Sequence, residues 1–273
     1  MRPQLSAHEA HLHHLILLDA EVTPEDVEAL ARSHYPHAGW VDTDTIALEH
    51  EVSLTGPWAV PAKIAAQLGA PGWVAQAVVV LCPQERLGEV PESLRGVDEI
   101  ADAYPYATPQ GIELETLQFA RSAARRLAGA LHLAGTAVTI QPDSDESIDL
   151  VVYAPIYLRG DQALALVSGG DLDGMTRKTW SISLPARAGA IQVMANLHPV
   201  APIVLAAFEW AGLSVRGYEV RWHAPEDWLG RELTRAEREV RTEVAGAIET
   251  IAGRIAELTN GVCVDDDGFL VAL

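Results

Sequence analysis

Four histidines lie within the first fourteen residues of the chain: His8, His11, His13 and His14, with Glu9 among them. Imidazole is a common zinc ligand, and side chains three residues apart on a helical turn can approach one ion. His8 and His11 are therefore candidate metal ligands. The segment is one residue short of the H-E-x-x-H pattern, so the glutamate and the second histidine cannot take the roles that motif gives them. The alternative is a polar, histidine-rich segment without a metal.

A second candidate group consists of Asp42, Asp44 and His50. Residues 40–54 alternate in twos, which predicts two strands with a tight turn near residues 49–50. If the alternation holds, the three polar side chains lie on the same side of the sheet as Ile46. Two carboxylates and an imidazole could then hold a metal or act as a general acid-base pair. The alternative is solvated carboxylates before a strand and a histidine in a turn.

The glycine-rich loop at residues 168–174 is the preferred ligand-binding candidate. Its candidate residues, with the adjacent basic pair, are Gly169, Gly170, Asp171, Asp173, Arg177 and Lys178. Glycines allow the backbone to approach a ligand, aspartates can coordinate a hard cation, and basic side chains can pair with an anion. The loop lacks the spacing of an EF-hand or of a phosphate-binding loop, so an ordinary turn between strands is the alternative.

Familiar catalytic motifs are absent from the sequence: it has no G-x-S-x-G, G-x-G-x-x-G, Walker or C-x-x-C pattern. We therefore expect a non-catalytic binding or interaction module, with no cofactor. One alternative is a hydrolase that uses a divalent metal held by the histidines and aspartates above. Another is a small-molecule binder, with Arg177, Arg216 or Arg221 receiving an anionic ligand between two halves of the chain.

Composition narrows the classes of partner. The formal net charge is −19 and the sequence pI is about 4.8, so nucleic acid and anionic membrane surfaces would be repelled. No segment has the length and apolar character of a membrane span or a signal peptide, which predicts a cytoplasmic protein. Cys82 and Cys263 lie among apolar residues, as small buried hydrophobes do. Tryptophan is enriched at protein interfaces, so the seven tryptophans are compatible with a homo-oligomer or a protein partner.

The order of predicted elements suggests two related α+β halves. Residues 190–223 read as a strand, a proline-led helix and a strand, and residues 51–82 repeat that order with the same apolar spacing. With the strand at residues 12–18 and the helix that starts at Thr23, the first half has a ferredoxin-like order, an antiparallel sheet with helices on one face. We place the halves at residues 1–154 and 155–273 and predict an internal duplication.

The remaining elements complete each half. A helix over residues 112–134 should follow an irregular, proline-rich connection at 83–110. A connection of this length is either a functional flap or carries short helices of its own. A longer helix, capped by Thr234 and Glu237, should follow the strands of the second half. Its apolar face should include Ile255 and Leu258, and a hairpin turning at residues 266–268 should end the chain.

Overall fold

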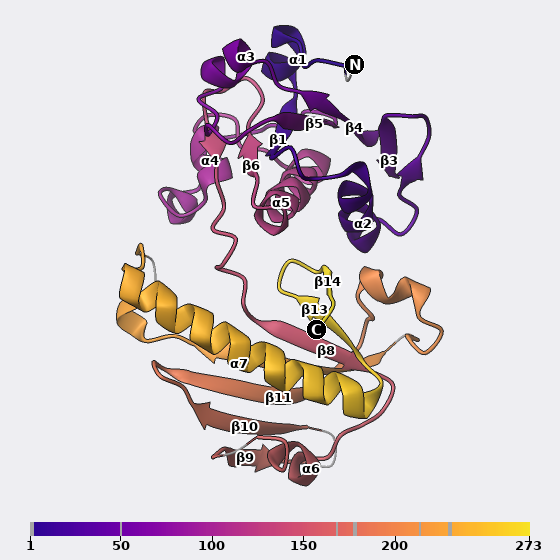
Figure 1. Ribbon diagram of the computed structural model, residues 1–273, viewed down its shortest axis with the longest axis vertical. Helices are drawn as coiled ribbons and strands as arrows, with labels where there is room; N and C mark the ends of the chain where they lie inside the picture. The colour runs from indigo at the N-terminus through magenta and orange to yellow at the C-terminus, as the bar shows by residue number, and fades with distance from the viewer. Residues whose placement is uncertain (1–2, 50, 168, 177–178, 213, 229–230) are drawn as a thin grey trace. The chain divides into compact units, whose positions relative to one another are not determined.

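The chain folds into two compact units, residues Met1–Ser144 and Asp145–Leu273 (Figure 1). The structure is a computed structural model, which describes residues 3–49, 51–167, 169–176, 179–212, 214–228 and 231–273. Each unit contains one antiparallel sheet of seven strands and its own helices. The predicted fold class, α+β with two similar halves and mostly antiparallel sheets, is confirmed, but the helices of the first unit lie on both faces of its sheet and not on one.

The sheet of the first unit is built around a fully buried central strand. Its strands are β1 (His14–Leu18), β2 (Gly39–Trp40), β3 (Thr45–Glu49), β4 (Val52–Ala59), β5 (Gln76–Leu81), β6 (Ala130–His132) and β7 (Thr139–Ile140). They lie in the order β2-β3-β4-β5-β1-β6-β7, so β3, β4 and β5 form a meander beside β1. All five residues of β1 are buried, as its continuous apolar run predicts for a strand covered on both faces.

Helices cover both faces of this first sheet. The helices are α1 (Ala7–Leu12), α2 (Pro24–His34), α3 (Ala62–Gln67), α4 (Glu99–Ala103) and α5 (Gly111–Arg126). The helices α2 and α5 lie together on one face, where Phe119 of α5 contacts the ring of Tyr35 at a centroid distance of 5.2 Å. On the other face, α1 and α3 pack over Leu15 and Leu17 of β1. Alternate residues of one strand therefore point into two separate apolar layers.

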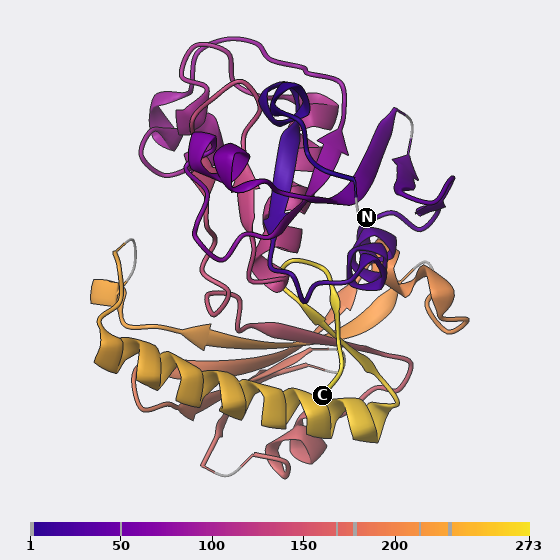
Figure 2. The same cartoon turned by 45° about the horizontal axis from the view of Figure 1, so that its top comes forward.

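The sheet of the second unit has one long helix across one of its faces. Its strands are β8 (Leu150–Ala154), β9 (Asp171–Met175), β10 (Trp180–Pro185), β11 (Ala190–His198), β12 (Val215–His223), β13 (Val262–Asp265) and β14 (Leu270–Val271). Their order is β14-β13-β8-β12-β11-β10-β9. The long helix α7 (Arg235–Thr259) and the short helix α6 (Gly160–Leu164) lie on one face (Figure 2). Two short 3-10 helices, η2 (Ile203–Ala207) and η3 (Glu226–Trp228), occur in its connections.

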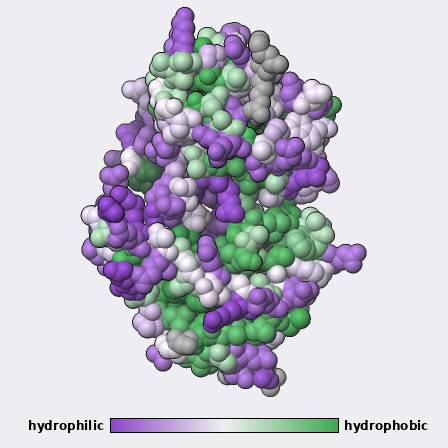
Figure 3. All heavy atoms as spheres, in the orientation of Figure 1, coloured by the Kyte–Doolittle hydropathy of each residue, from purple (hydrophilic) through white to green (hydrophobic). Residues whose placement is uncertain are grey.

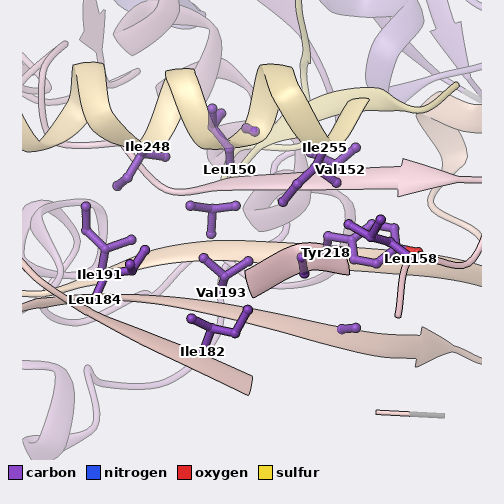
Figure 4. Packing of buried hydrophobic residues seen from close by; sticks show 14 of the residues in the cluster. Leu150, Val152, Leu158, Ile182, Leu184, Ile191, Val193, Tyr218, Ile248 and Ile255 are labelled. Carbon is purple, nitrogen blue, oxygen red and sulfur yellow. Dashed lines mark hydrogen bonds between the residues drawn. The ribbon is translucent and has the colours of Figure 1, made fainter. Parts of the chain in front are cut away.

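The core of the second unit lies between α7 and its sheet. Ile248 and Ile255 of α7 approach Leu150, Val152 and Val193 of the strands (Figure 4). The helix buries residues at positions 244, 248, 252, 255 and 259, a regular helical stripe. Leu258 lies outside this stripe and is 55% exposed, so its expected place on the inner face was wrong. The opposite face of the sheet is covered only in part, by η2 over β8 and β13.

The two units have the same strand order. When strands are numbered within each unit along the chain, both sheets read 2-3-4-5-1-6-7. The helical segments also correspond, because α2 and α6 follow strand 1, α3 and η2 follow strand 4, and α5 and α7 follow strand 5. The two similar segments expected at residues 51–82 and 190–223 thus occupy the same place in their sheets. Descent from one duplicated unit stays a prediction, which this shared order favours.

A glycine marks the same position in both units. Gly129 precedes β6 and Gly261 precedes β13, and each packs against the backbone of strand 1 of its own sheet. An added Cβ would lie 2.6 Å from the Leu17 carbonyl oxygen in one case and 2.8 Å from the Tyr153 carbonyl oxygen in the other. Only glycine permits so close an approach of two backbones.

Two expected boundaries differ from the structure. The helix predicted over residues 112–134 ends at Arg126, because the chain turns at Ala128 (φ 48°) and Gly129 into strand β6. The last strand assigned to the first half, β8, pairs with β12 and β13 in the sheet of the second unit. None of the helices in the described part of the chain is both long and apolar enough to cross a membrane.

Candidate functional site

The glycine-rich loop becomes an edge strand. Gly169 has a φ of 80°, which a glycine adopts without strain, and Gly170 packs tightly over Ile182 and Leu184. The chain then continues as β9, in which Asp171 pairs with Ser183 and Asp173 with Ser181. The side chain of Asp171 is exposed. Arg177 and Lys178 lie outside the described residues. The described part of this segment therefore supplies a sheet edge.

The N-terminal histidines His8 and His11 lie on helix α1, and both are exposed. The helix is capped by Ser6, whose hydroxyl accepts from the Glu9 backbone N–H, while the Glu9 carboxylate accepts from the Ser6 N–H. The Glu9 carboxylate, which lies among the histidines in the sequence, is therefore already used as a hydrogen-bond acceptor in the capping box. His11 lies beside a cavity that also reaches His132, and His8 does not line it.

Asp42 and Asp44 lie in the loop between β2 and β3, before the alternating strand begins. The Asp44 backbone N–H donates to Asp42 Oδ1 at 3.1 Å, a local turn that uses one carboxylate oxygen. This hydrogen bond lowers the pKa of Asp42 below its ordinary value. His50 lies outside the described residues. Throughout the described ranges, no three His, Cys, Asp or Glu side chains are grouped closely enough to hold a metal ion.

A buried polar cluster, formed by His14, Arg86 and Glu113, lies on the α5 face of the first sheet. Glu113 is fully buried in the first turn of α5. Its Oε1 lies 3.1 Å from His14 Nε2 and accepts a hydrogen bond of 2.8 Å from Arg86 Nε. Arg86 Nη2 lies 2.7 Å from the same oxygen without the alignment of a hydrogen bond. Oε2 accepts from the backbone N–H of Glu85 at 2.8 Å.

The hydrogen bonds fix the tautomer of His14. The backbone N–H of Ala134 donates to His14 Nδ1 at 3.1 Å, so the ring proton must lie on Nε2, facing Glu113. Burial by itself would raise the pKa of Glu113, but the bonds from His14 and Arg86 outweigh burial and hold it below its ordinary value. Glu113 is therefore ionised at neutral pH, and both its oxygens are already bonded within the protein.

This cluster anchors the long connection between β5 and α5. Arg86 also stacks on Tyr104, with its guanidinium 4.0 Å from the ring centroid, and the Tyr104 hydroxyl donates to the Ala134 carbonyl at 2.8 Å. Burial raises the pKa of Cys82, beside the cluster, to about 11, so its thiol stays protonated at neutral pH. Groups that are bonded to one another in this way hold the segment at 83–110 in place.

The second unit contains a groove of about 860 Å³ between the end of α7 and strand β14. We call it the α7–β14 groove. Its apolar lining includes Phe208, Ala256, Val262, Leu270, Val271 and Leu273. The surface of α7 is recessed at Gly253, where an added Cβ would meet only Leu273 Cβ, at 3.8 Å. Hydrophobic side chains gather over β14 and the C-terminal end (Figure 3). Leu273 is 54% exposed beside this recess.

Acidic side chains form the rim of the α7–β14 groove. Glu249 and Glu257 both line it and are exposed on α7, about two helical turns apart. Across the described ranges, neither carboxylate has an ion-pair partner. Arg254, the basic residue between them, donates from Nη1 to the Leu166 carbonyl at 2.9 Å. Arg254 also lines the groove and keeps its charge, so the rim carries two carboxylates and one guanidinium around an apolar interior.

A further polar group lies on the sheet face opposite α7. Glu219 of β12 accepts from Asn196 at 2.9 Å and from Arg221 at 2.9 Å. His198 Nε2 lies 3.8 Å from the same carboxylate, and its ring meets Tyr153 edge-on. Alternating polar residues along β11 and β12 are the sequence signal for this half-open face.

Sequence reasoning missed the groove and the buried cluster. Two glycines within one predicted helix, Gly246 and Gly253, are the signal that could have indicated a recess in α7. No local pattern joins His14 to Glu113, 99 residues later. Comparison with known protein families, with curated proteins and with solved structures found no match.

Proposed function

We propose that this chain is a non-catalytic binding module, whose second unit binds an extended apolar segment of a partner protein in the α7–β14 groove. The observation that carries the proposal is the groove itself: about 860 Å³ of space with an apolar lining at the edge of a sheet. Exposed apolar surface of this kind, with a polar rim, is typical of sites where another protein docks.

The position of the groove favours a strand-like partner. β14 ends the strand order of the second sheet, so within this unit one of its edges has no neighbouring strand. An extended peptide beside such an edge gains backbone hydrogen bonds, while its alternate side chains enter pockets. β14 is only two residues long, which leaves most of the affinity to the apolar side chains in the groove.

Charge defines the second requirement for the partner. Because Glu249 and Glu257 lie unpaired at the rim, basic residues at the ends of the segment would be attracted and acidic ones repelled. The net charge of −19 adds a long-range attraction for a basic partner. We therefore expect a segment of alternating apolar residues flanked by lysine or arginine.

Selection from a displayed library of random twelve-residue peptides tests the proposal on the full chain. Selected peptides should share alternating apolar positions with basic flanks, and they should bind the wild type measurably in fluorescence anisotropy. Gly253→Leu should weaken that binding at least about tenfold, because its side chain fills the recess beside Leu273.

Gly246→Leu is the matched control. It is the same substitution in the same helix, at an exposed position where an added Cβ meets nothing within 4 Å. Both variants replace a glycine within a helix by a good helix former, so neither should unfold α7. Peptides that bind Gly253→Leu as tightly as Gly246→Leu, or the absence of any enriched sequence, would refute the proposal.

A further inference from the structure

His132 offers a free lone pair in the interior of the first unit. Its side chain is buried, with 2% of its surface exposed. Its Nδ1 lies 3.0 Å from the hydroxyl of Thr139, and that hydroxyl donates its only proton to the Leu68 carbonyl at 3.0 Å. Thr139 can therefore only accept from His132, which places the ring proton on Nδ1. Nε2 is left unprotonated, and it has no hydrogen-bond partner within the described ranges.

A cavity of about 290 Å³ lies against this imidazole. Apolar walls come from α1, from α3 and from the residue after α3, and include Ala10, Ile64 and Leu68; the exposed Gln67 also lines the cavity. Thr136 also lines the cavity, but its hydroxyl already donates to Leu133 and accepts from Val138. Burial lowers the pKa of His132 to about 4, with smaller contributions from His14 and His11, so Nε2 remains an acceptor at neutral pH.

The second unit shows that the fold does not need a polar pair at this place. His132 pairs with Leu15 of β1 and Thr139 of β7. By strand order and register, the equivalent of His132 is Val264, which pairs with Val151 of β8 and Leu270 of β14. An apolar pair occupies the same position there, without any polar side chain. The polar pair of the first unit therefore requires an explanation besides stability.

We propose that this cavity, the His132 cavity, binds a small neutral molecule with a compact apolar body and one O–H or N–H group, which donates to His132 Nε2. The apolar walls suit the body of such a ligand, and the lone pair selects its donor. An anion would not be favoured, because the neutral imidazole has no positive charge to pair with it. Among the described residues that line the cavity, a metal ion would find two imidazoles, those of His11 and His132, and no carboxylate or thiolate. This site is independent of the α7–β14 groove.

Phenol and toluene are the probes that test the proposal, because they share a shape and differ in one hydroxyl. Titration of the full chain, labelled with nitrogen-15 at histidine, reports both affinity and the environment of His132 Nε2 by NMR. Phenol should bind about five- to tenfold more tightly than toluene, the value of one hydrogen bond. It should also shift the Nε2 resonance of His132, and toluene should not.

Two variants separate the acceptor from the structural hydrogen bond. His132→Asn keeps an N–H donor for Thr139 and removes the acceptor at the Nε2 position, so it should bind both probes equally. His132→Gln can place an amide oxygen near that position, so it should retain part of the preference for phenol. Circular dichroism and melting temperature establish that each variant is folded.

Three results would overturn the proposal. The first is no saturable phenol binding to the wild type. The second is an equal affinity of the wild type for the two probes. The third is zinc chloride, titrated alone, perturbing His11 and His132 together while phenol leaves them unchanged, which would make the cavity a metal site.

Discussion

Removing the Glu113 carboxylate should destabilise the first unit strongly. Glu113→Ala leaves the Arg86 guanidinium with 19% of its side chain exposed and no counter-charge, and it leaves the Nε2–H of His14 without an acceptor. Breaking a buried ion pair by removing one partner costs about 3–5 kcal/mol. For a unit of this size, such a cost lowers the melting temperature by roughly 10–15 °C.

Calorimetry and hydrogen exchange measured by mass spectrometry on the full chain check this value and its location. The lower-melting transition should belong to the first unit, and exchange should rise most in peptides from residues 83–110, which the cluster anchors. Glu243→Ala is the control, because it removes the carboxylate of the exposed pair Arg187–Glu243, whose ions lie 2.8 Å apart. It should leave the melting temperature unchanged.

A double-mutant cycle tests the physical reason. With Glu113 already replaced, Arg86→Ala removes an unpaired charge, so the double variant should be less destabilised than the sum of the single variants. The reasoning is refuted if Glu113→Ala lies within about 1 kcal/mol of the wild type, or if the two changes are additive. Either result would mean that the cluster is not coupled through its charge.

Two further predictions concern the pH dependence of stability and a strained turn. The pKa of His132 is about 4 in the folded chain against an ordinary 6.5, so stability should fall as pH drops from 6.5 towards 4. The loss attributable to His132 is at most roughly 3 kcal/mol, and His132→Asn should abolish that share in urea unfolding measured across this range. Gly189 has a φ of 68°, and an added Cβ would overlap the His223 carbonyl oxygen. Gly189→Ala should therefore cost at least about 2 kcal/mol in urea unfolding, whereas Gly212→Ala, with open space around it, should cost much less.

Local signals in the sequence predicted the elements well where the physics is local. The capping boxes of Thr23 with Asp26 and of Thr234 with Glu237 are present, because both residues of each pair lie in one helical turn. The alternation predicted over residues 40–54 is confirmed for residues 45–49 and 52–54, with Glu51 in a turn between β3 and β4, whereas residues 41–44 form a loop. The predicted end of helix α5 was wrong, because the chain leaves the helix before Ala128, and no local pattern indicates the positive φ of that residue.

The candidate sites were less predictable, because each depends on contacts between distant parts of the chain. The sequence indicated His11 as a ligand on the grounds of its neighbours, yet the structure places it beside His132, 121 positions further along. The glycine-rich loop had residue types suited to ligand binding, but Asp171 and Asp173 lie in β9, which pairs with β10 at the edge of the sheet. Residue type and spacing could not reveal either outcome, because neither one reports which strands will pair.

By itself, the sequence of this protein determined its α+β class, the buried strand β1 in the core of the first unit, the capped helices and the likeness of residues 51–82 to 190–223. These follow from periodic burial and backbone capping, which act over a few residues. The tertiary structure alone decided the shared strand order of the two units, the anchoring of residues 83–110 by Glu113, the α7–β14 groove and the His132 cavity. Each arises from sheet register and helix packing, which bring together groups that no local interaction connects.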